Sequence, residues 1–147
     1  ERIDHMVIET RSPEETFRLG RKLGEAALPG QVFTLTGDLG TGKTVFTQGF
    51  AKGLGIAEPV NSPTFTIDQV YDEGRLPLYH FDVYRIGDVE EMEEVGFEDY
   101  VMGEGVSLIE WAELISEILP EKRTAVRIEK DLEQGFDYRK ITIEELG

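Results

Sequence analysis

The sequence predicts an α/β domain built around a mixed β-sheet, and three observations support this class. First, the apolar segment QVFTLT (31–36) runs directly into the glycine-rich stretch GDLGTGKT (37–44), which a helical pattern follows. Second, β-rich segments occur in two pairs, each joined by a polar turn. Third, 147 residues are enough for one domain with a substantial core, so residues 1–147 are expected to form a single domain.

The first elements expected are a strand and a helix. MVIET (6–10) is typical of a short strand, and SPEETFRLGRKLGEAAL (12–28) is typical of a helix. The start of this helix is marked by Ser12 as the N-cap, Pro13 at the first helical position and Glu15 as the partner in a capping box. Much of its apolar face is expected to come from Phe17, Leu19, Leu23 and Leu28.

Similar patterns predict the remaining elements. Helices are expected over 43–55, over 88–96 with Asp88 as the N-cap, and over 112–119, where Pro120 stops the helix. Further strands are expected at 31–36, 62–71, 76–86, 105–111, 124–133 and 138–146. The strands on either side of DEGR are expected to form one β-hairpin, and those around QGFD a second. The sheet is expected to be parallel near the glycine-rich stretch.

The charge balance argues against direct binding of nucleic acid. Thirty acidic residues oppose fifteen basic ones, which gives a formal net charge of −15. Such a field repels nucleic acid and anionic membranes, so any RNA is expected to be held mainly by another molecule. The absence of cysteine excludes disulfides, thiolate metal sites and cysteine nucleophiles. No apolar run is long enough for a membrane span, and a cytoplasmic location is the simplest expectation.

The glycine-rich stretch matches G-x-x-x-x-G-K-[ST], the phosphate-binding loop, or P-loop. Its glycines let backbone N–H groups turn inward to form an anion nest, and the N-terminus of the following helix adds positive potential. Lys43 is placed to reach the β- and γ-phosphates of a nucleotide, and the Thr44 hydroxyl to bind Mg²⁺. A strand before the loop and a helix after it disfavour a chance match and predict a three-layer fold like that of P-loop NTPases. The expected nucleotide contacts are Gly37, Asp38, Leu39, Gly40, Thr41, Gly42, Lys43 and Thr44.

Two acidic residues are candidates for supporting the metal. Asp82 ends the apolar segment LYHFD, and Glu110 ends VSLIE. Magnesium in nucleotide sites usually contacts a carboxylate at the end of an apolar strand. Either acid alone could be a solvated residue at a strand end, but two such acids in one short chain favour a shared Mg²⁺ site.

Three hypotheses remain for what the protein does with the nucleotide. The chain has no D-x-x-G or N-K-x-D signature, which disfavours a GTPase. No arginine-rich lid segment is visible, which disfavours a small-molecule kinase. ATP binding with hydrolysis is the favoured hypothesis. A nucleotide-dependent binding module with negligible turnover, and a small-molecule kinase, are the alternatives.

Five motifs occur in a characteristic order: GDLGTGKTVF, VNSPTF, YHFDVYRI, EEVGFEDY and LIEWAE. In these the chain resembles the TsaE (YjeE-type) family of small bacterial ATPases over roughly residues 12–112. The resemblance implies a role in making N6-threonylcarbamoyladenosine at position 37 of tRNA. It implies a protein that binds Mg-ATP, docks on the TsaD–TsaB pair and hydrolyses ATP to sustain turnover, with tRNA contacted only indirectly.

The resemblance also implies roles for single residues. Glu110, Lys43 and Asp82 are expected to be catalytic, with Glu110 orienting or deprotonating the attacking water. Thr44, Asp82 and Glu110 are the expected ligands of Mg²⁺. Thr64, in the SPT segment (62–64), could sense the γ-phosphate, although a plain turn is an equal alternative.

The base of the nucleotide has no sequence motif of its own. In the family it lies near the N-terminal segment and the C-terminal hairpin, which implies contacts from Pro13 and Gly135. Trp111 is the only tryptophan and follows Glu110 directly, so it is either a core anchor or a nucleotide contact. For His80 a buried core histidine is favoured over a ligand, and for Arg85 an ion pair is favoured over a phosphate contact.

The segment 88–99 is strongly acidic, with seven acids in twelve residues. A solvated helix is the simpler interpretation, and a docking face for a basic partner is the alternative.

Overall fold

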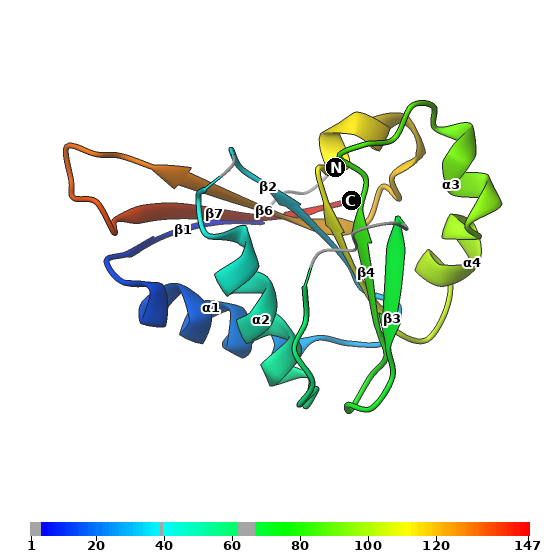
Figure 1. Cartoon of the computed structure of the whole chain (residues 1–147), viewed down its shortest axis with the longest axis horizontal. Helices are drawn as coiled ribbons and strands as arrows, with labels where there is room; N and C mark the ends of the chain where they lie inside the picture. The colour runs from blue at the N-terminus through cyan, green and yellow to red at the C-terminus, as the bar shows by residue number, and fades with distance from the viewer. Residues whose placement is uncertain (1–3, 39, 62–66) are drawn as a thin grey trace.

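A seven-stranded mixed sheet confirms the predicted α/β class (Figure 1). The computed structural model describes residues 4–38, 40–61 and 67–147. The strands are β1 Asp4–Thr10, β2 Val32–Thr36, β3 Asp68–Tyr71, β4 Leu78–Asp82, β5 Val106–Glu110, β6 Arg123–Lys130 and β7 Arg139–Leu146. The helices are α1 Pro13–Ala26, α2 Lys43–Gly53, α3 Glu90–Glu94, α4 Phe97–Val101 and the 3₁₀-helix η1 Ala112–Ile118.

The centre of the sheet is parallel, as expected near the glycine loop. The strand order is β1-β7-β6-β2-β5-β4-β3, with β2 parallel to both β5 and β6, and β4 parallel to β5. The two predicted hairpins, β3–β4 and β6–β7, are antiparallel, and β1 adds to the outside of β7. This order brings the C-terminal ends of β2, β4 and β5 together at one edge, where ligands bind in open α/β sheets.

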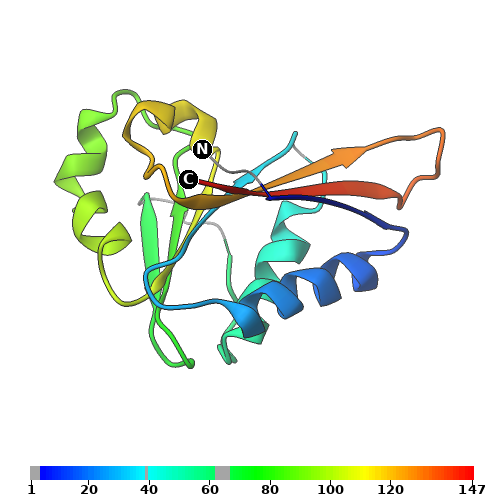
Figure 2. The ribbon, with the colours of Figure 1, turned by 180° about the vertical axis from the view of Figure 1, so that it is seen from behind.

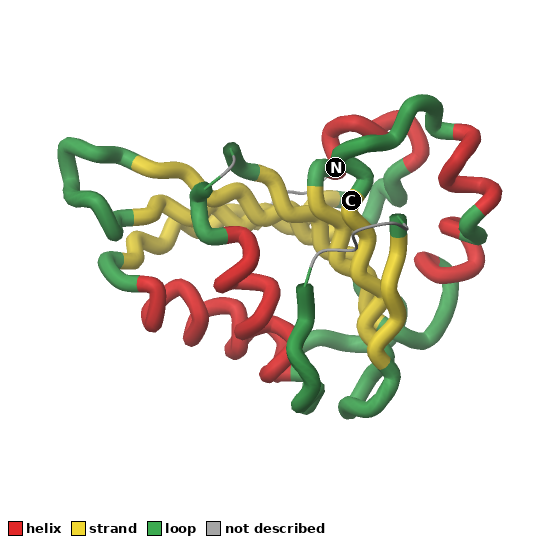
Figure 3. The backbone as a smooth tube through the Cα atoms, viewed as in Figure 1, coloured by secondary structure: helices red, strands yellow, loops and turns green. Residues whose placement is uncertain are grey.

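Helices cover both faces of the sheet and complete three layers (Figure 3). On one face, α1 and α2 enclose a core that contains Phe33, Leu35, Phe46 and Phe50. On the other, α3, α4 and η1 enclose a second core that contains Val32, Phe81, Phe97 and Ile109. Neighbouring residues of one strand, such as Val32 and Phe33, enter different cores because side chains alternate across a strand. No helix in the described part of the chain combines the length and apolar character of a membrane span.

Glycines form the contact between α1 and α2. A Cβ atom on Gly49 of α2 would lie 2.2 Å from the backbone oxygen of Phe17 in α1, and one on Gly24 would lie 2.2 Å from that of Phe50. Both distances are too short for a side chain, so only glycine permits this backbone approach. The close contact fixes α2, whose N-terminus follows the glycine loop.

The predicted apolar face of α1 is therefore partly wrong. Its buried residues are Thr16, Gly20 and Gly24, and Phe17 is only partly buried. Leu19 and Leu23 are also partly buried but pack against the core, as predicted. Leu28 lies beyond the helix and is 65% exposed. The start of α1 is as predicted: Ser12 Oγ accepts from the backbone N–H of Glu15, at 3.2 Å. Glu15, however, accepts from the N–H of Arg11 rather than that of Ser12.

Two other predicted helices differ from expectation. The helix expected over 88–96 ends at Glu94, and a separate helix, α4, follows Gly96, whose φ is +79°. The helix expected over 112–119 is a 3₁₀-helix with a kink at Ile115.

Candidate functional site

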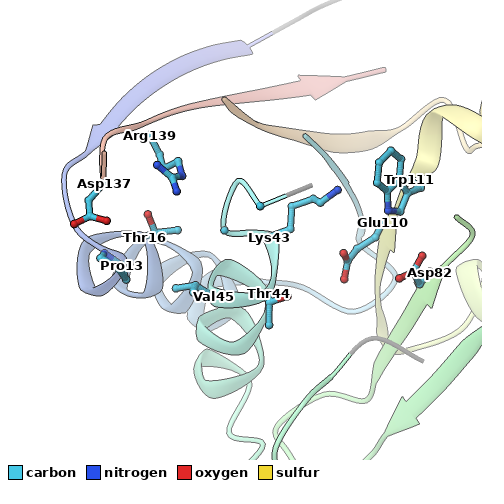
Figure 4. Close-up of a pocket in the computed structure, with 12 residues that line it drawn as sticks. Pro13, Thr16, Lys43, Thr44, Val45, Asp82, Glu110, Trp111, Asp137 and Arg139 are labelled. Carbon is cyan, nitrogen blue, oxygen red and sulfur yellow. The ribbon is translucent and has the colours of Figure 1, made fainter. Parts of the chain in front are cut away.

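A cavity of about 400 Å³ opens beside the glycine loop, at the C-terminal ends of β4 and β5 (Figure 4). Figure 4 shows two groups of side chains at its ends, with Lys43, Thr44 and Val45 between them. The residues that line it are Pro13, Thr16, Gly40, Gly42, Lys43, Thr44, Val45, Asp82, Glu110, Trp111, Asp137 and Arg139. The cavity thus combines the loop with both strand-end acids that the sequence singled out.

The glycine loop owes its shape to tight backbone contacts. A Cβ atom on Gly37 would lie 2.6 Å from the backbone oxygen of Ile128 in β6, so no larger residue fits there. The loop is closed by a hydrogen bond from Thr41 Oγ1 to the backbone oxygen of Asp38, at 2.8 Å. Arg139 of β7 adds an external support, because its Nε donates to the backbone oxygen of Thr41 at 2.7 Å.

Lys43 is buried, and its charge is stabilised on two sides. Its Nζ donates to the backbone oxygen of Gly37 at 2.6 Å and lies 3.9 Å from the centre of the Trp111 ring. The indole itself packs against the tilted ring of Tyr84, with ring centres 4.7 Å apart. An ammonium over an indole face is a favourable cation–π contact. The lysine is therefore held beside the loop by the Gly37 carbonyl and the Trp111 ring.

Trp111 adopts a strained backbone conformation. Its φ is +62°, and within the described residues it is the only non-glycine with positive φ. A bulky residue in this region costs free energy and is found mainly where the surroundings enforce it, often at functional sites. The strain turns the chain sharply after Glu110 and directs the indole over Lys43.

The two strand-end acids are neighbours across the sheet. Asp82 and Glu110 are register partners in the parallel pair β4–β5. Glu110 is only 4% exposed, and its Oε2 lies 2.6 Å from Nε2 of His80, which is 1% exposed. His80 and Asp82 share a face of β4 because they are two residues apart. A buried carboxylate requires a polar partner, and His80 supplies it.

The donor atoms at this end suit magnesium. Thr44, Asp82 and Glu110 contribute one hydroxyl and two carboxylates to the same cavity, and Mg²⁺ prefers such oxygen ligands. In Figure 4 the carboxylates of Asp82 and Glu110 lie close together at one end of the cavity. Asp137 lies at the other end, with Lys43 between them. Asp82 is oriented by a hydrogen bond from the N–H of Tyr84 to its Oδ1, at 3.1 Å.

The opposite end of the cavity is formed by α1 and the β6–β7 hairpin. Pro13 and Thr16 face Asp137 and Arg139 there. Arg139 Nη1 donates to the backbone oxygen of Phe136 at 2.9 Å, which fixes the base of the hairpin. Next to it, the Tyr138 hydroxyl donates to Glu9 Oε2 at 2.7 Å. This hydrogen bond, together with burial and nearby carboxylates, raises the pKa of Tyr138.

Comparison with known proteins identifies the family. The family model described as "Threonylcarbamoyl adenosine biosynthesis protein TsaE" matches residues 10–141. This chain belongs to the TsaE family. The resemblance seen in the sequence motifs is thereby confirmed.

Curated relatives support the TsaE assignment over most of the chain. The tRNA threonylcarbamoyladenosine biosynthesis protein TsaE of Bacillus subtilis is 51% identical over 138 residues, which cover 94% of this chain and 84% of the relative. The protein of the same name from Treponema pallidum is 44% identical over 119 residues, covering 81% and 87%. The crystal structure of Bacillus subtilis YdiB matches with a TM-score of 0.81 at 41% identity, covering 100% of this chain and 89% of that one.

The predicted site residues of this TsaE chain fall into four groups. The cavity is lined by Pro13, Gly40, Gly42, Lys43, Thr44, Asp82, Glu110 and Trp111. A neighbouring cavity, which β6 helps to line, includes Gly37, Asp38 and Thr41. Leu39 and Thr64 lie outside the described residues, as does the whole SPT segment. Gly135 does not line the first cavity, although Asp137 of the same turn does.

Several contacts were not predicted from the sequence. His80 is buried, as expected of a core histidine, but it is only partly satisfied: Nε2 contacts the predicted catalytic acid, whereas Nδ1 has no hydrogen-bond partner among the described residues. The spacing of His80 and Asp82 in one strand was the only sequence feature that could have placed His80 beside the acidic end of the site. Thr16 and Arg139 belong to none of the sequence motifs, and Val45 was part of a motif but was not singled out as a site residue. The ion pair favoured for Arg85 is not formed within the described part of the chain, where Arg85 is exposed.

Proposed function

We propose that this protein is a magnesium-dependent ATPase that acts in the formation of N6-threonylcarbamoyladenosine in tRNA. One observation carries the chemical part of the proposal: the lysine and threonine of the glycine loop share one cavity with two carboxylates from β4 and β5. The biological part rests on the TsaE family and on relatives whose names state this role.

In this proposal the loop and α2 bind the phosphates of ATP. Lys43 would exchange the Gly37 oxygen for a β- or γ-phosphate oxygen, which is a stronger, charge-assisted partner. The backbone N–H groups at the start of α2 would add to this attraction. Leu39 and Thr64 remain proposed contacts, as do Gly37, Asp38 and Thr41 within the loop.

The end of the cavity that contains Asp82 and Glu110 would hold the metal and orient the attacking water molecule. Thr44, Asp82 and Glu110 would hold Mg²⁺, which neutralises phosphate charge when bound. Glu110 has one carboxylate oxygen engaged by His80. This contact fixes the side chain so that the other oxygen can orient a water molecule or take a proton from it.

The opposite end would hold the adenosine part. Pro13 and Thr16 offer one wall, and Asp137 and Arg139 the other, with Gly135 in the adjoining turn. A carboxylate such as Asp137 can accept from the amino group of adenine, which guanine lacks at that position. This arrangement would favour ATP over GTP.

The protein would work with partners rather than alone. As the family resemblance implies, it would dock on the TsaD–TsaB pair in the cytoplasm and contact tRNA only indirectly. The net charge of −15 supports this division, because it opposes attraction to the RNA backbone.

The test is a reconstituted reaction with TsaD, TsaB, threonylcarbamoyl-adenylate and tRNA. The unchanged protein should sustain many rounds of tRNA modification in Mg-ATP, and Lys43→Ala should not, because it loses a charge-assisted phosphate contact worth about 1.5–3 kcal/mol. Lys52→Ala, an exposed lysine of the same helix, is the matched control. Many rounds without this protein would refute the proposed role. Many rounds with a folded Lys43→Ala that binds no ATP would refute the ATPase mechanism.

Trp111 is expected to report nucleotide binding through its fluorescence. Its ring lies against the Lys43 ammonium, and the chain contains no other tryptophan. Transfer of Lys43 to a phosphate changes the charge beside the indole and should alter the emission. The measurement is a titration with Mg-ATP, with Lys43→Ala as the control that removes the cation. An emission spectrum unchanged at saturation, with binding shown by calorimetry, would contradict this arrangement.

A further inference from the structure

Arg139 connects the C-terminal hairpin to the glycine loop, which lies 98 residues away along the chain. In Figure 2 the β6–β7 hairpin continues beyond the end of β2 and runs alongside the start of α2. Nε of Arg139 donates to the backbone oxygen of Thr41 at 2.7 Å. Nη1 donates to the backbone oxygens of Phe136, at 2.9 Å, and Tyr138, at 2.7 Å. The hairpin therefore fixes the guanidinium, and the Nε contact extends this fixed position to the loop.

This contact determines the orientation of one peptide group in the loop. Thr41 is buried, and a buried backbone oxygen requires a hydrogen-bond donor, which Arg139 supplies. The peptide group that joins Thr41 to Gly42 is planar and trans, so its C=O and its N–H point in opposite directions. Because the oxygen is held toward Arg139, the N–H of Gly42 must point away from Arg139.

The N–H group of Gly42 is available to a ligand. Gly42 is the N-cap of α2 and lines the cavity, and within the described residues its N–H donates no hydrogen bond. Unpaired N–H groups at the start of a helix attract phosphate oxygens. Without the Nε donor the Thr41 oxygen would lose its partner. The peptide group could then rotate toward another donor, which would turn the Gly42 N–H away from its present direction.

We propose that Arg139 is a positioning residue for phosphate binding, because its Nε holds the Thr41–Gly42 peptide group with the Gly42 N–H directed at the phosphates. This role rests on the proposed function and extends the nucleotide site to a residue outside the glycine-loop motif. It depends on the position of one hydrogen-bond donor rather than on the positive charge of the side chain.

Two substitutions separate the donor from the charge. In Arg139→Gln an uncharged N–H group is attached to Cδ, where arginine carries Nε. In Arg139→Lys the charge is kept, but a methylene group replaces Nε. Arg139→Met removes both the donor and the charge.

The probe is inorganic tripolyphosphate with Mg²⁺, which has phosphates but no base or ribose. Arg139→Gln should bind it nearly as tightly as the unchanged protein does. Arg139→Lys and Arg139→Met should bind it roughly tenfold more weakly, as expected for the loss of one hydrogen bond. The affinities are measured by calorimetry in about 0.5 M salt, which screens long-range attraction between charges.

Steady-state ATP hydrolysis provides a second measurement. Arg139→Lys and Arg139→Met should raise KM for ATP and leave kcat unchanged, because the end of the cavity with Asp82 and Glu110 is intact. Lys140→Met is the matched control. Lys140 is the next residue of β7, it is exposed, and its side chain lies on the opposite face of the strand. This control should match the unchanged protein in both measurements.

The outcomes distinguish this role from the proposed function. If the unchanged protein binds neither Mg-ATP nor tripolyphosphate, the proposed function fails and the role of Arg139 fails with it. If the unchanged protein binds both but Arg139→Lys binds tripolyphosphate as tightly, only the positioning role is overturned. A loss of affinity for ATP alone also overturns it and restricts Arg139 to the adenosine end. If Arg139→Met does not fold, the comparison of glutamine with lysine decides.

Discussion

Replacing Glu110 by glutamine should lower the rate of Mg-dependent ATP hydrolysis by roughly 10²–10⁴-fold, the usual contribution of a general base. Glutamine has nearly the same shape but cannot take a proton from water. If phosphate binding rests mainly on Lys43 and the loop, as proposed, the affinity for ATP should change much less than the rate. The measurements are the rate of phosphate release at saturating Mg-ATP and the ATP dissociation constant from calorimetry.

A nearby acid provides the control for this substitution. Glu117 is exposed on η1, the helix that begins two residues after Glu110, and it does not line the cavity. Glu117→Gln should therefore hydrolyse ATP at the unchanged rate. A Glu110→Gln protein with normal turnover would show that Glu110 is not the base and would leave Asp82 as the other carboxylate at the end of the cavity proposed to hold the metal.

Replacing Gly49 by alanine should destabilise the fold by about 3 kcal/mol, the upper part of the range for an overpacked core. The added methyl group would sit 2.2 Å from the backbone oxygen of Phe17, so α1 and α2 must move apart. Alanine favours a helix over glycine by only about 1 kcal/mol, which is too little to offset this clash. The shift would appear as a lower midpoint of urea unfolding.

The neighbouring position separates the clash from helix propensity. Gln48 precedes Gly49 in α2 but is exposed. Gln48→Ala should leave the unfolding midpoint nearly unchanged. If Gly49→Ala were as stable as the natural protein, the two helices would tolerate separation and the glycine contact would not be needed for stability.

Local sequence signals were sufficient for most elements but not for their packing. Ser12 and Pro13 marked the start of α1, and the turn residues marked both hairpins. Leu28 was wrongly placed on the buried face because α1 ends at Ala26, two residues before it. The tightest contact of α1 instead depends on Gly24 and Gly49, which have no side chain to count. Pairing of β1 with β7 joins distant parts of the chain, and no local pattern indicated it.

The candidate site was predictable to the extent that its residues form consecutive motifs. The loop from Gly37 to Thr44 could be read directly, and Asp82 and Glu110 were recognisable as acids at strand ends. The hydrogen bond of His80 to Glu110 depends on the pairing of β4 with β5, which sequence spacing alone does not give. The contact of Arg139 with Thr41 likewise depends on the position of β7.

The central position of β2 affects how the protein folds during synthesis. Both neighbours of this strand, β5 and β6, are made long after it, so its edges stay unpaired until residues 106–110 and 123–130 have been translated. Such distant pairing gives a high contact order, which slows folding and prolongs exposure of an aggregation-prone strand. Gly37 also meets Ile128 of β6, so the glycine loop cannot reach its final shape before β6 emerges. A ligand of this loop can therefore stabilise the finished domain but cannot guide the early steps of its folding.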